Sequence, residues 1–123
     1  MPNSPLPDFQ LGWLLYRAEQ LEAAAEAFEH ALARQDAHVP SLLALGIARG
    51  RQGAVEAANA CFEKVLRLEP DSPDAGFGLG VGLANQSRFD EARRPLQDLV
   101  ERHPDAALAR AALAALASSD RTS

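Results

Sequence analysis

The sequence predicts an all-α fold of stacked antiparallel helix pairs, and three observations lead to this prediction. The 123-residue chain matches itself at a shift of 34 residues, which places Gly12, Gly46 and Gly80 in equivalent positions. Its apolar residues recur at helical rather than strand spacing. Its composition is rich in alanine, the strongest helix former. A fixed period of this length indicates stacked copies of one unit, none of which buries its apolar face alone.

The repeat extends from small residues to large ones at fixed spacing. The equivalent positions are Leu11-Gly12, Leu45-Gly46 and Leu79-Gly80, then Ala24, Ala58 and Ala92, then Phe28, Phe62 and Leu96, then Ala31, Val65 and Leu99. A small residue on the first helix of each unit lets the second helix approach closely. The large residue then fills the space between neighbouring units, as a close-packed helical hairpin requires.

Turn signals divide the chain into seven helices. We expect the helices at about 7–18, 21–34, 40–51, 54–68, 73–86, 89–102 and 106–117, with a tail over 118–123. Pro40 and Pro73 fit a first helical turn, where no amide donor is needed, and Gly53 suits a tight turn between helices. Pro70 and Pro104 end the helices that precede them.

Composition and charge exclude several function classes. The net charge of -5 and the pI near 5.1 oppose the basic surface of a nucleic-acid binder. No apolar run is long enough to enter and cross a bilayer, and the first residues do not resemble a signal peptide. A single cysteine, Cys61, forms no internal disulfide. A cytoplasmic protein is the expectation.

Residues that could support catalysis or metal binding are scattered. No two of His30, His38 and His103 have the spacing that places two imidazoles on one helix face. No Gly-x-Ser-x-Gly elbow, Cys/His nucleophile pattern or phosphate-binding glycine loop is present. We therefore expect no enzyme activity, no cofactor and no metal.

The repeated pattern of Leu-Gly on one helix, Ala and Phe on the next, and Pro at the exit resembles the tetratricopeptide repeat. The resemblance implies a single domain over 1–123, an α-solenoid whose helix pairs form a right-handed superhelix. It divides into repeats at about 5–38, 39–72 and 73–106, with a capping helix at about 106–117. Departures are Leu15, Arg49 and Leu83 in place of the usual aromatic, and Asp36 in place of the first exit proline.

In this family the first helices of the repeats line a concave groove. The resemblance assigns to this groove the apolar residues Phe9, Trp13, Tyr16, Leu43, Ile47, Phe77 and Val81, with Arg17, Arg51 and Asn85 at the helix ends. The residues independently show that Phe9, Trp13 and Tyr16 form a helical stripe distinct from that of Leu11, Leu15 and Ala18, which we expect to face the second helix. Such a stripe is either ordinary core or an exposed binding surface. We favour the groove, with Trp13 as its central anchor.

The last predicted helix has no following helix to cover Leu113 and Leu116. We weigh equally an apolar surface that is simply tolerated and a surface for a homodimer.

These patterns predict a non-catalytic, adaptor or co-chaperone-like module that binds an apolar helix or extended peptide of a partner protein. Some family members bind acidic tails of heat-shock proteins through a carboxylate clamp of Lys, Asn and Arg. The matching positions here are mostly apolar, so that specificity is not expected. The alternatives are a self-assembling scaffold that uses the groove or the last helix, and a regulatory subunit of an enzyme complex.

Overall fold

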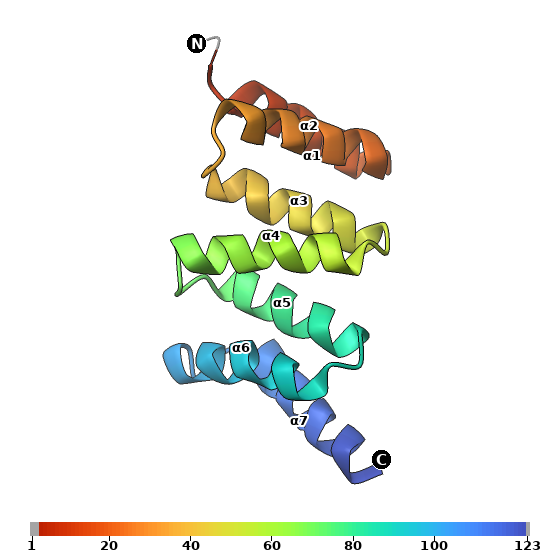
Figure 1. Ribbon diagram of the computed structural model, residues 1–123, viewed down its shortest axis with the longest axis vertical. Coiled ribbons are helices and arrows are strands. Elements are labelled where there is room, and N and C mark those ends of the chain that lie inside the picture. Colours follow the sequence, from red (N-terminus) through yellow and green to blue (C-terminus); the bar gives the residue numbers. More distant parts are fainter. Residues whose placement is uncertain (1–2, 123) are drawn as a thin grey trace.

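The computed structural model describes residues 3–122, with side chains up to Ser118, and confirms the all-α prediction. Seven α-helices and no strand occur in this range. The helices are α1 (Leu6–Arg17), α2 (Leu21–Arg34), α3 (Val39–Arg51), α4 (Val55–Leu68), α5 (Pro73–Asn85), α6 (Phe89–Arg102) and α7 (Ala107–Thr122). They stack in chain order into an elongated solenoid, with the termini at opposite ends (Figure 1).

The turn inside each helix pair has the same geometry in all three repeats. In each turn, the backbone N–H of the residue just before the second helix donates a hydrogen bond of 2.9 Å to a carbonyl oxygen of the first helix. The pairs are Gln20 with Leu15, Ala54 with Arg49, and Arg88 with Leu83. The residue before each donor has a left-handed backbone, and it is a glycine only at Gly53. This is the capping arrangement that commonly ends helices.

Close contact within each pair depends on the repeated glycine. A Cβ placed on Gly46 would come within 2.7 Å of the Phe62 ring, and one on Gly80 within 2.5 Å of Leu96 Cγ. Gly12 meets Phe28 in the same way. Phe62 also lies against Gly78 of the next repeat, so one ring fills the space between two units, as predicted.

The core runs along the stack as two clusters of buried side chains. One joins the first helix pair to α3 through residues such as Phe28 and Ala48. The other extends from Leu42 on α3 through Phe62 and Leu96 to Leu116 on α7. Each repeat therefore packs mainly on its neighbours, as expected of a solenoid.

The predicted helix limits agree with the structure except at the C-terminal end. We expected a tail from residue 118, but α7 continues to Thr122. The prediction was wrong because residues 118–122 include no proline or glycine, so nothing local stops the helix. Residue 123, the last of the predicted tail, lies outside the described residues.

Candidate binding groove

The first helices of the repeats form the inner side of the stack. The backbone of α1 approaches that of α3, α3 approaches α5, and α5 approaches α7. Within residues 3–122, α2 and α4 stay farther apart, and so do α4 and α6. In a curved stack the elements that lie closer together are on the concave side. The concave face is therefore made by α1, α3, α5 and α7.

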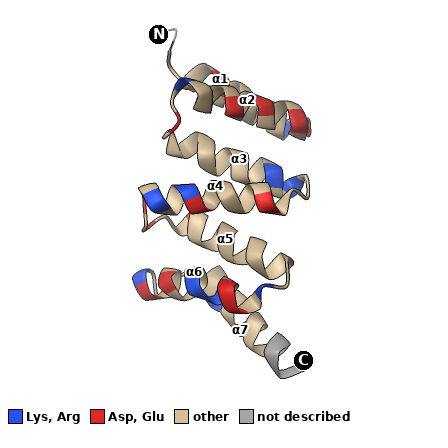
Figure 2. Ribbon diagram, in the orientation of Figure 1, with Lys and Arg blue, Asp and Glu red and all other residues tan. Residues whose placement is uncertain are grey.

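The middle of this face is apolar and almost free of charge. Leu43 and Ile47 lie one helical turn apart on α3, and Phe77 and Val81 lie one turn apart on α5. Ile47 is 38% exposed, and the other three are half-buried. Figure 2 shows charged residues gathered on α2, α4 and α6, whereas α5 carries only Asp74, in its first turn, and the charges of α3 lie in its last turn. The structure thus brings the four predicted residues of α3 and α5 onto neighbouring inner helices.

An aromatic cluster lies at the N-terminal end of this face. The rings of Trp13 and Tyr16 have centroids 5.1 Å apart, and those of Phe9 and Trp13 are 6.3 Å apart, both edge to face. Trp13 also packs edge to face on Phe28 of α2, at 5.4 Å. Phe9, Trp13 and Tyr16 are half-buried, so each contributes to the core and keeps part of its surface open.

The predicted division of α1 into two stripes was wrong in part. We expected Leu11, Leu15 and Ala18 to face α2, but only Leu15 packs against the core. Leu11 is 47% exposed, and Ala18 caps the helix and is also exposed. The aromatic stripe takes their place against Phe28, because aromatic rings on α1 can span the distance to α2 while Gly12 keeps the two helices close.

Polar residues mark the helix ends beside the groove. Arg51 donates a hydrogen bond to Glu19 at 2.8 Å, and its guanidinium lies 5.2 Å from the centre of the Tyr16 ring. The hydrogen bond that Arg51 donates to Glu19, followed by its hydrogen bond with Tyr16, raises the pKa of Arg51, which therefore stays positively charged. Arg17 and Asn85 are exposed. Arg51 is thus held by its own chain.

The two residues predicted as an oligomer surface on α7 face inward. Leu116 is only 5% exposed and belongs to the core, and Leu113 is partly buried against the same core. The assignment of Leu116 to an exposed surface was wrong, because α7 lies across α5 and α6 and uses these leucines as its packing face. The large apolar residue that α7 does expose is Leu108, at 70%.

Residues 3–122 can be compared by geometry with what a metal site, a membrane-crossing helix and a reactive cysteine require. No three His, Cys, Asp or Glu side chains lie together as metal ligands within this range. No helix there is long and apolar enough to cross a bilayer. Cys61 is half-buried, and this burial raises the pKa of its thiol, which makes it a poor nucleophile.

One feature of the surface was missed by the sequence reasoning. A pocket opens between α4 and α6, over Gly76 and Leu79 of α5. The sequence does contain a sign of this pocket, because Gly76 occupies the position that the larger Leu42 fills one repeat earlier. A comparison of side-chain volumes at equivalent positions of the repeats predicts an unfilled space at Gly76.

Family models described as tetratricopeptide repeat match residues 43–107, 77–120 and 9–38. No curated protein matches the sequence. The TPR domain of Arabidopsis OM64 has a TM-score of 0.89 and 16% identity, covering 94% of this chain and 96% of that domain. The first TPR of Spaghetti (RPAP3), solved with the HSP90 peptide SRMEEVD, has a TM-score of 0.90 and 13% identity over 94% of this chain and 92% of that chain.

The Yersinia enterocolitica type III secretion chaperone SycD, solved with a peptide of the translocator YopD, has a TM-score of 0.86 and 16% identity, covering 93% of this chain and 92% of that chain. These likenesses agree with the helix pairing, the repeated turns and the matched family models. The chain belongs to the tetratricopeptide repeat family.

Proposed function

We propose that this protein is a non-catalytic interaction module whose concave face binds an apolar helix or extended segment of a partner protein. The observation that carries the proposal is the uncharged inner face of α3 and α5, where Ile47 is 38% exposed beside half-buried Leu43, Phe77 and Val81. Contiguous exposed apolar surface of this kind usually marks an interaction site. Two structural neighbours, the Spaghetti (RPAP3) repeat and SycD, were solved with bound peptides, which supports the same use of the fold.

The charge pattern favours an apolar ligand over an acidic one. A ligand rich in carboxylates needs several cationic side chains aimed into the groove. Here Arg51 is already bonded to Glu19, and the centre of the groove has no basic residue on α5. Exposed Arg17 would pair with a single acidic group that flanks the apolar segment.

Ile47 and Trp13 have different roles in this proposal. Ile47 on α3 has the largest open surface among the predicted residues of α3 and α5, so this proposal takes it as the central anchor in place of Trp13. Trp13 is held against Phe28 and forms one end of the groove. Removing a central anchor typically weakens binding by about 2 kcal/mol or more, or roughly 30-fold.

The test begins with a peptide selected from a displayed random library against the wild-type protein. The dissociation constant of that peptide is then measured by fluorescence anisotropy for wild type, Ile47→Asp and Leu68→Asp. Leu68 is a matched control, because it is 45% exposed but lies on α4, outside the concave face. We expect Ile47→Asp to lose at least about 30-fold in affinity. Equal affinities for folded Ile47→Asp and wild type would refute the proposed site.

A second candidate function, self-assembly, is favoured by the N-terminal end of the stack. Leu11 is 47% exposed and Leu14 is 64% exposed, whereas Leu45 and Ala48, their equivalents one repeat later, are 9% and 0% exposed. Leu45 and Ala48 are covered by α2. Leu11 and Leu14 therefore offer the same kind of apolar surface to a helix of another chain. Sedimentation velocity should then show association that Leu14→Asp abolishes. A monomeric wild type at high concentration excludes this candidate.

A further inference from the structure

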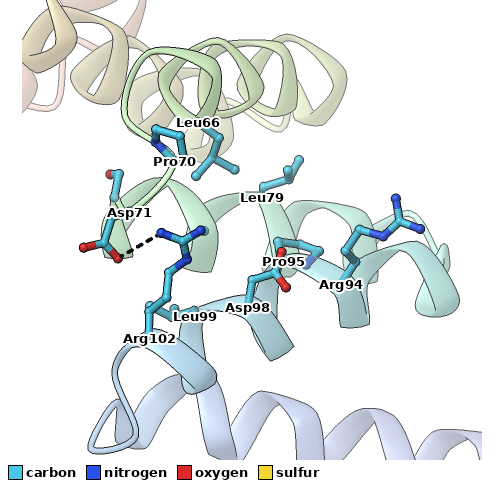
Figure 3. Close-up of a pocket in the computed structure, with 11 residues that line it drawn as sticks. Leu66, Pro70, Asp71, Leu79, Arg94, Pro95, Asp98, Leu99 and Arg102 are labelled. Atoms are coloured by element: carbon cyan, nitrogen blue, oxygen red, sulfur yellow. Dashed lines mark ion pairs between the residues drawn. The ribbon is translucent and has the colours of Figure 1, made fainter.

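The pocket between α4 and α6 has an apolar floor and a charged mouth. Its volume is about 280 Å³, and α5 forms its base (Figure 3). Leu66, Leu79, Pro95 and Leu99 supply apolar walls from three helices. The volume lies just below the range of about 300–1,000 Å³ that is typical of small-molecule sites. It suits one side chain better than a whole metabolite.

This pocket is separate from the concave groove. Gly76 and Leu79 of α5 line it, whereas Phe77 and Val81, which we assign to the groove, do not. At about 3.6 residues per turn, these two pairs of positions point away from each other. The space exists because the backbones of α4 and α6 stay apart on the outer side of the stack.

The chain itself shows what kind of side chain fits here. The position of Gly76 is occupied one repeat earlier by Leu42, which is 4% exposed and shares a core cluster with Val65. Val65 is the equivalent of Leu99. A Cβ on Gly76 would stand 3.7 Å from the Pro95 carbonyl oxygen and 3.8 Å from Leu99 Cβ, which is ordinary contact. The glycine therefore leaves open a space that a leucine side chain fills in the preceding repeat.

The mouth of the pocket contains a cation available to a ligand. Arg94 is exposed and makes no hydrogen bond or ion pair within the described part of the chain. Figure 3 shows its guanidinium turned away from Asp98. By contrast, Arg102 already forms an ion pair, with its Nη1 atom 3.8 Å from Asp71 Oδ1.

Some of the acidic side chains near Arg94 are already bonded to other arginines, and some are not. Glu91 accepts two hydrogen bonds from Arg88, and Asp90 is bonded to Arg93. Glu63 and Asp98 are exposed carboxylates in the same region. Arg94 therefore has room for one ligand carboxylate, and the site disfavours a strongly acidic segment.

We propose that the pocket between α4 and α6 is a second binding site, which takes a leucine-sized side chain of a partner peptide with a single carboxylate beside it. The side chain enters toward Gly76 and repeats the packing of Leu42. The carboxylate pairs with Arg94 at the mouth. Because the site lies outside the groove, a partner can engage it while the groove is occupied.

The test uses N-acetyl-L-leucine as the probe, since it joins the leucine side chain to one carboxylate. N-acetyl-L-leucinamide lacks the charge, and N-acetylglycine lacks the side chain. Each is titrated into isotopically labelled wild-type protein, and the amide signals of Gly76 and Leu99 are followed by NMR. We expect saturable shifts with N-acetyl-L-leucine at millimolar concentration. The leucinamide should bind several-fold more weakly, and N-acetylglycine should produce no shift.

Three variants locate the site. Gly76→Leu fills the pocket from within and should abolish the shifts at Leu99. Arg94→Ala should reduce the affinity for N-acetyl-L-leucine to that for the leucinamide, whereas Arg67→Ala, an exposed arginine on α4 outside the pocket, should leave it unchanged. Shifts of equal size in folded Gly76→Leu overturn the proposal. So does the absence of saturable shifts in wild type, or identical binding by Arg94→Ala and wild type.

Discussion

Asn59 and Gly82 form an unusual pair between α4 and α5, and their coupling can be measured. Asn59 is 3% exposed and donates a hydrogen bond from Nδ2 to Gln86 Oε1 at 3.0 Å, but its Oδ1 has no partner among the described residues. A Cβ on Gly82 would overlap Oδ1 and stand 3.0 Å from Cγ. One repeat earlier the same two positions are Ala25 and Ala48, both fully buried. The asparagine thus occupies volume that the glycine leaves free.

The magnitude follows from these contacts. In the wild-type background, Gly82→Ala forces the amide of Asn59 to move, at a cost of about 1–3 kcal/mol for overpacking, against a gain of about 1 kcal/mol in helix propensity. With Asn59→Ala the obstacle is gone and only the gain remains. Asn59→Ala alone should be close to neutral, because it loses one hydrogen bond but also removes a buried oxygen that lacks a partner. The expected interaction energy is therefore about 1–3 kcal/mol.

The assay is urea unfolding of wild type, both single variants and the double variant, followed by far-ultraviolet circular dichroism. The free energy of unfolding is obtained from the midpoint and slope of each curve. We expect Gly82→Ala to lower the midpoint in the wild-type background and to raise it in the Asn59→Ala background. Effects that add to within about 0.5 kcal/mol would refute the reasoning, since two residues in contact should not behave independently.

Two further predictions concern glycines of α5 and the cysteine. Gly76→Ala should raise the free energy of unfolding by about 0.5–1 kcal/mol, because the new methyl group meets only ordinary contacts, whereas Gly80→Ala should lower it by about 1–3 kcal/mol by striking Leu96. Thermal unfolding of both variants checks this, and equal shifts would contradict it. Burial raises the pKa of the Cys61 thiol, so alkylation by iodoacetamide at pH 8 should be slower in folded than in urea-unfolded protein. Equal rates would show that the thiol is open to solvent.

Most of the fold could be predicted because its determinants are local and repeated. The 34-residue period fixes which helices pair, and proline or glycine marks several of the joints, such as Gly53, Pro70 and Pro104. The C-terminal end of α7 was predicted too early, at residue 117, for the opposite reason. No local signal ends that helix, and the length of a helix without such a signal depends on its packing and on the composition of its last turns.

The site was harder to predict, because helical spacing identifies a stripe but not its partner. Trp13 and Leu11 both lie on apolar stripes of α1, and only the approach of α2 decides which stripe is covered. An apolar pattern on α7 does not show that Leu116 is covered, because the cover comes from the earlier helices α5 and α6. The pocket at Gly76 required a comparison of volumes between repeats, which an apolar pattern does not contain.

The most direct test of the central proposal is to map where an apolar peptide selected against this protein makes contact. Backbone amide shifts are recorded by NMR as the peptide is titrated to saturation. The proposal predicts that the largest changes fall on α3 and α5, around Ile47 and Val81, with the outer helices α4 and α6 little affected. Changes concentrated on α4 and α6, with Ile47 and Val81 unmoved, would contradict it.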